Sequence, residues 1–182
     1  MAEVAEAEFS RSFSESGEEV SFATELTALG GHVFEAPDAA AARAYIETLV
    51  SERGGGARVA RRPAVDRLQL ANVDSGCVLS DIHIGITQAD YGLADTGTLV
   101  MFAEAGEGRA LSLLPPIHIA VLEESRILAS LDELLAREPD FPARSSAMVF
   151  TTGPSRTADI ERTLTVGVHG PGELHVVIVP ML

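Results

Sequence analysis

Three short polar clusters follow apolar, strand-like runs and hold the side-chain types best suited to chemistry. The clusters read ADTGTL at 94–99, TTGPSRTADIE at 151–161 and GVHGPGE at 167–173. In open α/β sheets, ligands bind in the crevice at the carboxyl ends of the strands. These clusters are therefore the first candidates for a functional site.

The second cluster predicts a strand that turns sharply into a short helix. Gly153 permits a sharp exit from the strand, and Pro154 fixes its own backbone φ angle. A hydroxyl group from Ser155 or Thr157 can then cap a helix that starts near Ala158.

This turn has two interpretations. Unpaired N–H groups at the helix start, together with Arg156 and two hydroxyl groups, can hold a carboxylate or a phosphate. Alternatively, the segment is an ordinary capped connection, and its arginine pairs with Asp159 or Glu161 at the surface. The residues of the turn leave both interpretations open.

His169, in the third cluster, is the candidate for proton transfer. It lies between glycines in a loop that joins two strand-like runs, and histidine changes its charge near neutral pH. A turn histidine that bonds to the backbone is the alternative. His83, His118 and His175 lie within apolar runs, so we expect them to be satisfied inside the sheet.

In the first cluster, Asp95 and two threonines flank Gly97, so hydroxyl groups beside a glycine can approach a ligand closely. The complete phosphate-loop and dinucleotide motifs are absent. Just upstream, Asp90 and Tyr91 add a carboxylate and a phenol, which we expect to be turn or packing residues.

The composition excludes several classes of partner and cofactor. A net charge of −14 without any lysine leaves no basic surface for nucleic acid or an anionic membrane. The single Cys77 cannot form an internal disulfide or hold an iron–sulfur cluster, and no metal-ligand spacing occurs. No apolar stretch reaches membrane-spanning length, and the N-terminus is acidic, so we expect a cytoplasmic protein.

The pattern of helices and strands that must position the clusters predicts one α/β domain over 20–182. The acidic lead at 1–19 is expected to be solvated or partly disordered. Helical spacing and caps predict helices over 21–31, 38–56, 63–71 and 130–137. Short runs rich in Val, Ile, Leu and Thr predict strands, and several are apolar on both faces, as expected for the buried strands of an open, mostly parallel sheet. The runs are HVFEA, ARVARR, GCVLS, IHIGITQ, TGTLVMF, LSLLP, HIAVL, AMVFTTG, TLTVGV and LHVVIV.

Three stretches together resemble a known family: GITQADYGLADTGTLVM at 85–101, SLLPPIHIAVL at 112–122 and TTGPSRTADIERTLTVGVHGPGELHVVIV at 151–179. They look like the lactate utilisation protein C family (LutC/YkgG), which carries the LUD domain. The resemblance implies a NagB/RpiA/CoA-transferase-like fold. It also implies a cluster-free subunit that takes part in oxidising L-lactate to pyruvate with partner proteins that hold the iron–sulfur clusters.

The resemblance, carried over residue by residue, supplies a predicted site. It includes His169, which we predict as a catalytic residue. From the residues themselves we add Asp95 as a second catalytic candidate and predict no metal. The predicted anion- or substrate-binding residues belong to the family motifs: Thr96, Gly97, Thr98, Gly153, Pro154, Ser155, Arg156, Thr157, Asp159 and Gly170.

Two other functions stay open. One is a stand-alone enzyme that acts on a sugar phosphate or a CoA thioester, with its base or nucleophile among Asp95, Glu104 and His169. The other is a structural or regulatory subunit in which the motifs serve only the fold.

Overall fold

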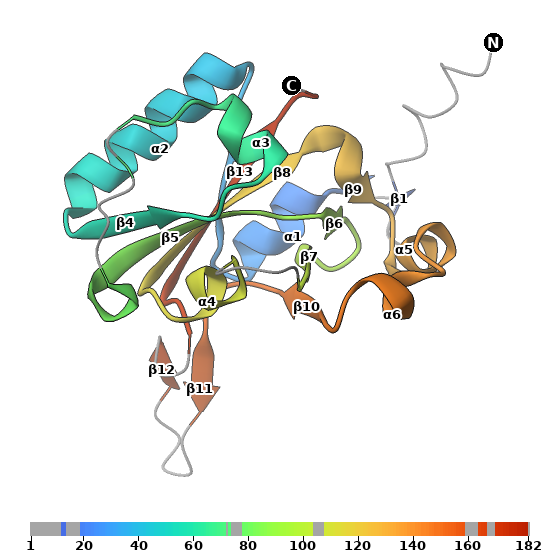
Figure 1. Cartoon of the computed structure of the whole chain (residues 1–182). Helices are drawn as coiled ribbons and strands as arrows, with labels where there is room; N and C mark the ends of the chain where they lie inside the picture. The colour runs from blue at the N-terminus through green and yellow to red at the C-terminus, as the bar shows by residue number, and fades with distance from the viewer. Residues whose placement is uncertain are drawn as a thin grey trace.

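Five parallel strands form the larger sheet of the computed structural model (Figure 1). Their order is β3 (His32–Glu35), β13 (Glu173–Val179), β8 (Ile117–Glu123), β5 (Ile82–Gln88) and β4 (Gly56–Val59). All four pairings are parallel. The three inner strands are long apolar runs because both faces of the sheet are covered. The predicted open α/β sheet is confirmed.

The structure describes only part of the acidic lead. There, β1 (Ser12–Phe13) pairs antiparallel with β2 (Glu19–Val20), and the domain boundary stays a prediction. No helix among the described residues is long and apolar enough to cross a membrane. The described residues are 12–13, 19–71, 73, 78–103, 108–158, 164–166 and 170–181.

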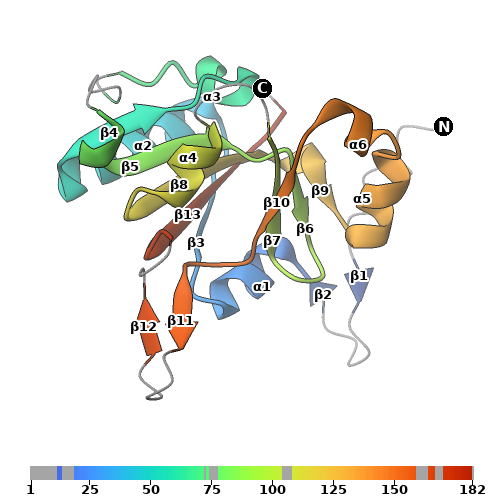
Figure 2. The ribbon, with the colours of Figure 1, turned by 60° about the horizontal axis from the view of Figure 1, so that its bottom comes forward.

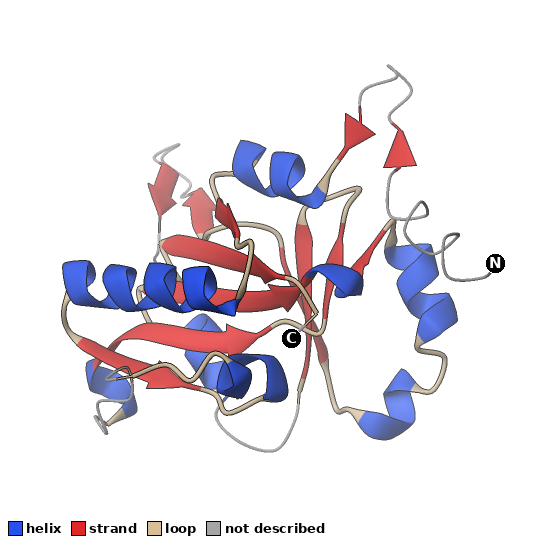
Figure 3. Cartoon of the chain, turned by 90° about the horizontal axis from the view of Figure 1, so that it is seen from above, coloured by secondary structure: helices blue, strands red, loops and turns tan. Residues whose placement is uncertain are grey.

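Helix α2 (Ala39–Arg53) covers one face of the larger sheet, and the longest helix in Figure 3 lies over its strands. Its predicted caps are confirmed. The Asp38 carboxylate accepts the N–H of Ala41 at 2.8 Å, and the helix ends at Gly54 with a φ of 63°. The buried face of α2 packs into the core with the sheet through Ala42, Ile46 and Leu49.

A second sheet of four strands packs beside the first (Figure 2). Helix α1 (Phe22–Ala28) contributes Phe22 and Leu26 to the core between the sheets, and Ser21 caps it as predicted. The strands, in order, are β10 (Met148–Thr151), β7 (Thr98–Phe102), β6 (Tyr91–Leu93) and β9 (Ile127–Leu128). The short helices α5 (Leu131–Arg137) and α6 (Phe141–Arg144) follow β9 in the chain.

Two predicted strands are wrong. LSLLP lies at the end of helix α4 (Gly108–Leu113), whose Leu111 carbonyl packs against Gly85 of the sheet. A short apolar run does not distinguish a strand from a helix without its tertiary partner. In GCVLS, the described part is a 3-10 turn, η1 (Leu79–Asp81), and Cys77 lies outside the described residues.

The helix predicted to start near Ala158 is also wrong. Strand β11 (Arg156–Ala158) pairs instead with β12 (Leu164–Val166) as an antiparallel hairpin that extends away from both sheets (Figure 2). Cross-strand bonds therefore take the place of the helix start that an anion was predicted to occupy. Of the two other predicted helices, 63–71 is shorter, as α3 (Pro63–Arg67), and 130–137 is confirmed as α5.

Candidate functional site

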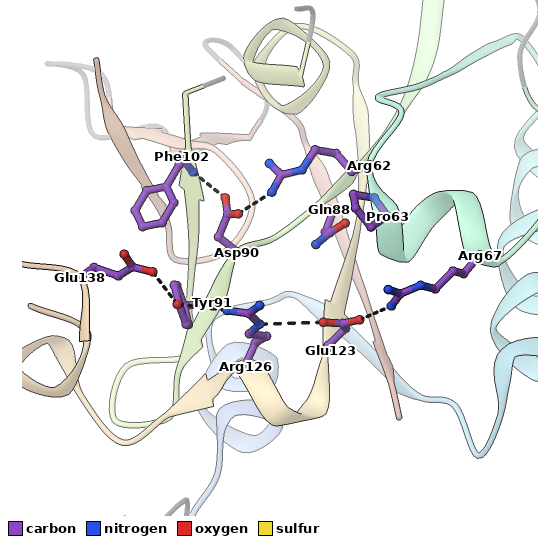
Figure 4. A pocket seen from close by; sticks show the side chains of 10 residues that line it. All are labelled: Arg62, Pro63, Arg67, Gln88, Asp90, Tyr91, Phe102, Glu123, Arg126 and Glu138. Atoms are coloured by element: carbon purple, nitrogen blue, oxygen red, sulfur yellow. Dashed lines mark hydrogen bonds and ion pairs between the residues drawn. The ribbon is translucent and has the colours of Figure 1, made fainter. Parts of the chain in front are cut away.

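A cleft of about 400 Å³ opens at the carboxyl edge of the parallel strands β4, β5 and β8 (Figure 4). This edge is where open α/β sheets bind ligands, because the loops after parallel strands meet there. The lining side chains lie at or after the ends of these strands, on the second sheet or at the end of α5: Arg62, Pro63, Arg67, Gln88, Asp90, Tyr91, Phe102, Glu123, Arg126 and Glu138.

One ion pair fixes the position of the β4–α3 connection against the strands. An Nη of Arg62 lies 2.6 Å from a carboxylate oxygen of Asp90, and both side chains are mostly buried. The other Asp90 oxygen accepts the backbone N–H of Phe102 at 2.7 Å. Asp90 therefore joins three segments of the chain at one point of the cleft.

A second group of charges is more open to solvent. The carboxylate of Glu123, at the end of β8, lies between Arg67 and Arg126 and presents one oxygen to each. The distances are 3.1 Å to Nη1 of Arg67 and 3.9 Å to Nε of Arg126. The two arginine side chains are about half exposed, at 50% and 48%, whereas Glu123 is 13% exposed. The two guanidinium groups thus face the cleft and already hold one carboxylate.

Tyr91 contacts the Arg126 guanidinium through both its hydroxyl group and its ring. Its phenol donates a hydrogen bond to Glu138 at 2.6 Å and accepts one from Nη1 of Arg126 at 3.1 Å. The guanidinium also lies 5.4 Å from the centre of the buried Tyr91 ring, within cation–π range. These contacts orient the arginine toward Glu123, as Figure 4 shows.

This arrangement is suited to binding an anion. Guanidinium groups form strong, directional hydrogen bonds with carboxylates and phosphates. Among the described residues, no group of three His, Cys, Asp or Glu side chains could hold a metal ion.

The predicted motif residues meet at a different place, around the end of helix α1. In the β6–β7 turn, the hydroxyl of Thr98 bonds to those of Thr96 and Thr152 at 2.8 Å each. Gly97 has a φ of 60° and packs so tightly that an added Cβ would lie 2.3 Å from the backbone nitrogen of Leu26. The turn formed by Thr96, Gly97 and Thr98 therefore packs directly against the backbone of helix α1.

The GPSRT loop contacts the same helix end. The guanidinium of Arg156 donates a hydrogen bond to the carbonyl of Leu29, the C-cap residue of α1. The N–H of Ser155 donates to the carbonyl of Pro171 at 2.8 Å, and Gly170 packs against the Ser155 side chain. Arg156 thus satisfies a carbonyl that a helix end leaves without an intrahelical partner.

These loops lie at the opposite edge of the larger sheet from the cleft. Leu29 and Gly30 precede β3, and Gly153 and Pro154 pack against them. The N–H of Gly172, just before β13, bonds to the carbonyl that precedes β8. The motif loops therefore gather at the amino edge of the parallel strands.

The remaining predicted residues are not brought into the cleft by the described structure. Asp95 is exposed in the β6–β7 turn and accepts a 3.2 Å hydrogen bond from Thr96. The other groups lie outside what the structure describes: His169, Asp159, Glu104 and the side chain of Thr157.

The expectation that three histidines are satisfied inside the sheet is confirmed for His175 and only half correct for His118, whose Nδ1 is buried with no hydrogen-bond partner in the described structure. It is wrong for His83, whose side chain is exposed because it points away from the core on strand β5. Nε2 of His118 pairs with the hydroxyl of Thr87 at 2.8 Å, and burial lowers the His118 pKa to about 4. Nδ1 of His175 pairs with the Tyr45 hydroxyl at 2.9 Å, and its ring stacks on His32. Burial also lowers the pKa of His175.

The cleft residues carried a signal that the sequence prediction did not use. Arg62 follows the run ARVA, and Glu123 and Arg126 follow HIAVL, so they occupy strand ends just as the glycine-rich clusters do. Asp90 and Tyr91 make structural contacts, as predicted for turn or packing residues. The prediction did not identify them as residues that line the cleft.

Comparisons with known proteins agree with the predicted resemblance. A family model described as the LUD domain matches residues 78–179. Lactate utilization protein C of Halalkalibacterium halodurans is 45% identical over 93 residues, which cover 48% of this chain and 40% of that protein. The uncharacterized protein YkgG of Escherichia coli is 42% identical over 92 residues, with 48% and 40% covered. The match thus spans less than half of these relatives.

The fold also has a solved counterpart. A crystal structure of a DUF162 family protein from Deinococcus radiodurans superposes with a TM-score of 0.61 and 24% identity, and covers 87% of this chain and 93% of that one. This likeness shows the fold, while the wider NagB/RpiA/CoA-transferase grouping stays a prediction. Seven of the ten cleft residues lie within the segment that the family model matches, and three precede it.

Proposed function

Because this chain belongs to the LUD domain family, we propose that it is a component of a lactate utilisation system that binds a small carboxylate in the cleft. The names of several relatives support the system. In this proposal the chain works in the cytoplasm and holds no redox cofactor. Partner proteins with iron–sulfur clusters accept the electrons when L-lactate is oxidised to pyruvate.

The position of Glu123 carries the binding proposal. Its carboxylate lies between Arg67 and Arg126, so the two guanidinium groups are spaced to hold a carboxylate, whether it belongs to the protein or to a ligand. A hydrogen bond to a charged group contributes about 1.5–3 kcal/mol. Two half-exposed arginines can therefore supply much of the affinity for a small acid such as L-lactate.

The GPSRT loop is the rival location for the anion. Its hydroxyl groups and Arg156 belong to the motifs that define the resemblance. Against this, Arg156 already donates to the carbonyl of Leu29 at a helix end, where the backbone dipole repels anions. We therefore place the carboxylate in the cleft.

A stand-alone enzyme is the second candidate function, and the size of the cleft favours it. A volume of about 400 Å³ lies near the lower end of the range of small-molecule pockets. A sugar phosphate or a CoA thioester would place its anionic group on the same arginines. Turnover of such a substrate by the purified chain alone would support this function over the first.

Calorimetric titration with sodium L-lactate, with sodium chloride as the reference salt, tests the proposed site. We expect Arg126→Gln to weaken binding about ten- to a hundredfold, because it removes a charge-assisted hydrogen bond. Arg137→Gln is the matched control, since Arg137 is equally exposed at 48% but pairs with Glu133 outside the cleft.

Arg156→Gln distinguishes the two locations. We expect it to lower the melting temperature without changing the affinity for L-lactate, because its partner is a helix carbonyl. If Arg156→Gln instead lowers the affinity for L-lactate and Arg126→Gln leaves it unchanged, the anion binds at the GPSRT loop. Lactate-dependent dye reduction with and without the iron–sulfur partners then tests the role in the system.

A further inference from the structure

Gln88 ends strand β5 inside the cleft, and its side chain is held in one orientation. Its Oε1 accepts the backbone N–H of Ala64 at 2.9 Å. Because that N–H can only donate, the carbonyl end of the amide faces Ala64 and the NH2 end faces away from it. Figure 4 shows the side chain beside Pro63, between the residues around Asp90 and those around Glu123. The two N–H groups of Gln88 are thus fixed in direction.

This amide is the uncharged donor that the cleft leaves available. Among the described residues that line the cleft, two side chains are polar and uncharged, Gln88 and Tyr91. The Tyr91 hydroxyl already donates to Glu138 and accepts from Arg126. The Nε2 of Gln88, in contrast, forms no hydrogen bond with any described residue. A ligand oxygen can therefore accept from Gln88 without breaking a hydrogen bond of the protein.

The groups that bind a carboxylate lie in the same cleft. Glu123 occupies one nitrogen of Arg67, Nη1, and one nitrogen of Arg126, Nε. A guanidinium group has five N–H donors, and both arginine side chains are about half exposed, so donors remain for a ligand carboxylate. Gln88 is also linked to one of these arginines, because Ala64 and Arg67 belong to the same helix, α3. The cleft thus combines cationic donors with one neutral donor.

We propose that Gln88 selects acids that carry an oxygen on the carbon next to the carboxylate, namely 2-hydroxy and 2-oxo acids. This inference rests on the proposed function, since the carboxylate of the acid binds Arg67 and Arg126. The Gln88 amide then donates a hydrogen bond to the oxygen on C2. A simple acid of the same length, such as propionate, keeps the carboxylate contacts but leaves the amide without an acceptor, so it binds more weakly.

The chemistry of an amide N–H explains why this position suits both L-lactate and pyruvate. The hydroxyl group of L-lactate can donate or accept, whereas the oxo group of pyruvate can only accept. An amide N–H only donates, so it can bond to the C2 oxygen in either oxidation state. A carboxylate in place of Gln88 would accept from the hydroxyl group but repel the oxo group.

The test compares the dissociation constants of L-lactate, pyruvate and propionate by calorimetric titration. For the natural protein we expect L-lactate and pyruvate to bind about two- to tenfold more tightly than propionate, which is the contribution of one neutral hydrogen bond. In Gln88→Leu we expect the three affinities to become equal. This variant also removes the acceptor for Ala64 and can move Arg67, but such a shift weakens all three acids alike, so the ratio of affinities is the readout.

Two further variants separate the roles of this side chain. Gln88→Glu keeps an acceptor for the Ala64 N–H and loses the donors, so we expect pyruvate to lose its advantage over propionate. Gln69→Leu is the matched control, because Gln69 is exposed and does not line the cleft, and it should keep the natural ratios.

The outcomes distinguish this inference from the proposed function. Equal affinities for the three acids in the natural protein would overturn the role of Gln88 and leave the cleft as a carboxylate site. A preference for pyruvate over propionate that persists in the Gln88 variants would overturn it in the same way. Absence of binding by all three acids would overturn the proposed function as well.

Discussion

Removal of the Asp90 carboxylate tests how far one side chain holds the cleft together. Asp90 accepts from Arg62 at 2.6 Å and from the N–H of Phe102 at 2.7 Å, and its side chain is 11% exposed. In Asp90→Ala, the guanidinium loses its close carboxylate and the N–H loses its acceptor. We expect a clear loss of stability rather than a local rearrangement.

The magnitude follows from burial. Breaking one side of a buried ion pair costs about 3–5 kcal/mol. Arg62 keeps 20% of its side chain exposed, so water compensates part of the loss, and we expect about 3 kcal/mol. For a domain of this size, each kcal/mol shifts the melting temperature by about 2–4 °C, which makes the expected shift roughly 6–12 °C.

Thermal unfolding and urea titration, each followed by circular dichroism, measure this loss. Asp66→Ala is the control, because the Arg61–Asp66 pair is 3.4 Å apart and about half exposed or more on both sides. An exposed pair of this kind contributes about 0–1 kcal/mol. Equal losses of stability in the two variants would refute the assigned role of Asp90.

Two further predictions concern parts of the fold outside the cleft. Gly97→Ala should destabilise the protein by about 1–3 kcal/mol in urea titration, because its Cβ would lie 2.3 Å from the Leu26 nitrogen, and an unchanged midpoint would contradict this packing. Folded His118 has a pKa of about 4, below the unfolded value of 6.5, so the unfolded chain binds its proton first as the pH falls. The free energy of unfolding is therefore unaffected by this histidine above pH 6.5 and decreases as the pH falls from 6.5 to 4. The loss is about 3 kcal/mol, and His118→Gln should flatten this acid limb; an unaltered pH profile in the variant would count against the assignment.

Local signals predicted the elements whose ends depend on neighbouring residues in the chain. Asp38 and Ser21 cap helices as predicted because the capping bond spans only three residues. The long apolar runs of β5, β8 and β13 identified buried parallel strands, since only a sheet covered on both faces needs such runs.

The failures occur where a distant partner decides the conformation. LSLLP lies in a helix end because α4 packs its backbone against Gly85, 26 residues before Leu111. The segment after Ser155 becomes a strand because Leu164–Val166 pairs with it. Neither partner can be identified from the few residues that each pattern spans.

The sequence by itself determined the fold class, the family and the caps of the first two helices, because motifs and short-range patterns specify these properties. Only the tertiary structure decided which polar residues share a site. Parallel strands bring Arg67 next to Glu123, which lies 56 residues further along the chain and also faces Arg126. The glycine-rich motifs gather at the opposite edge around a helix end. The physical reason is that strand order and direction, set by the packing of the whole core, determine which loops meet.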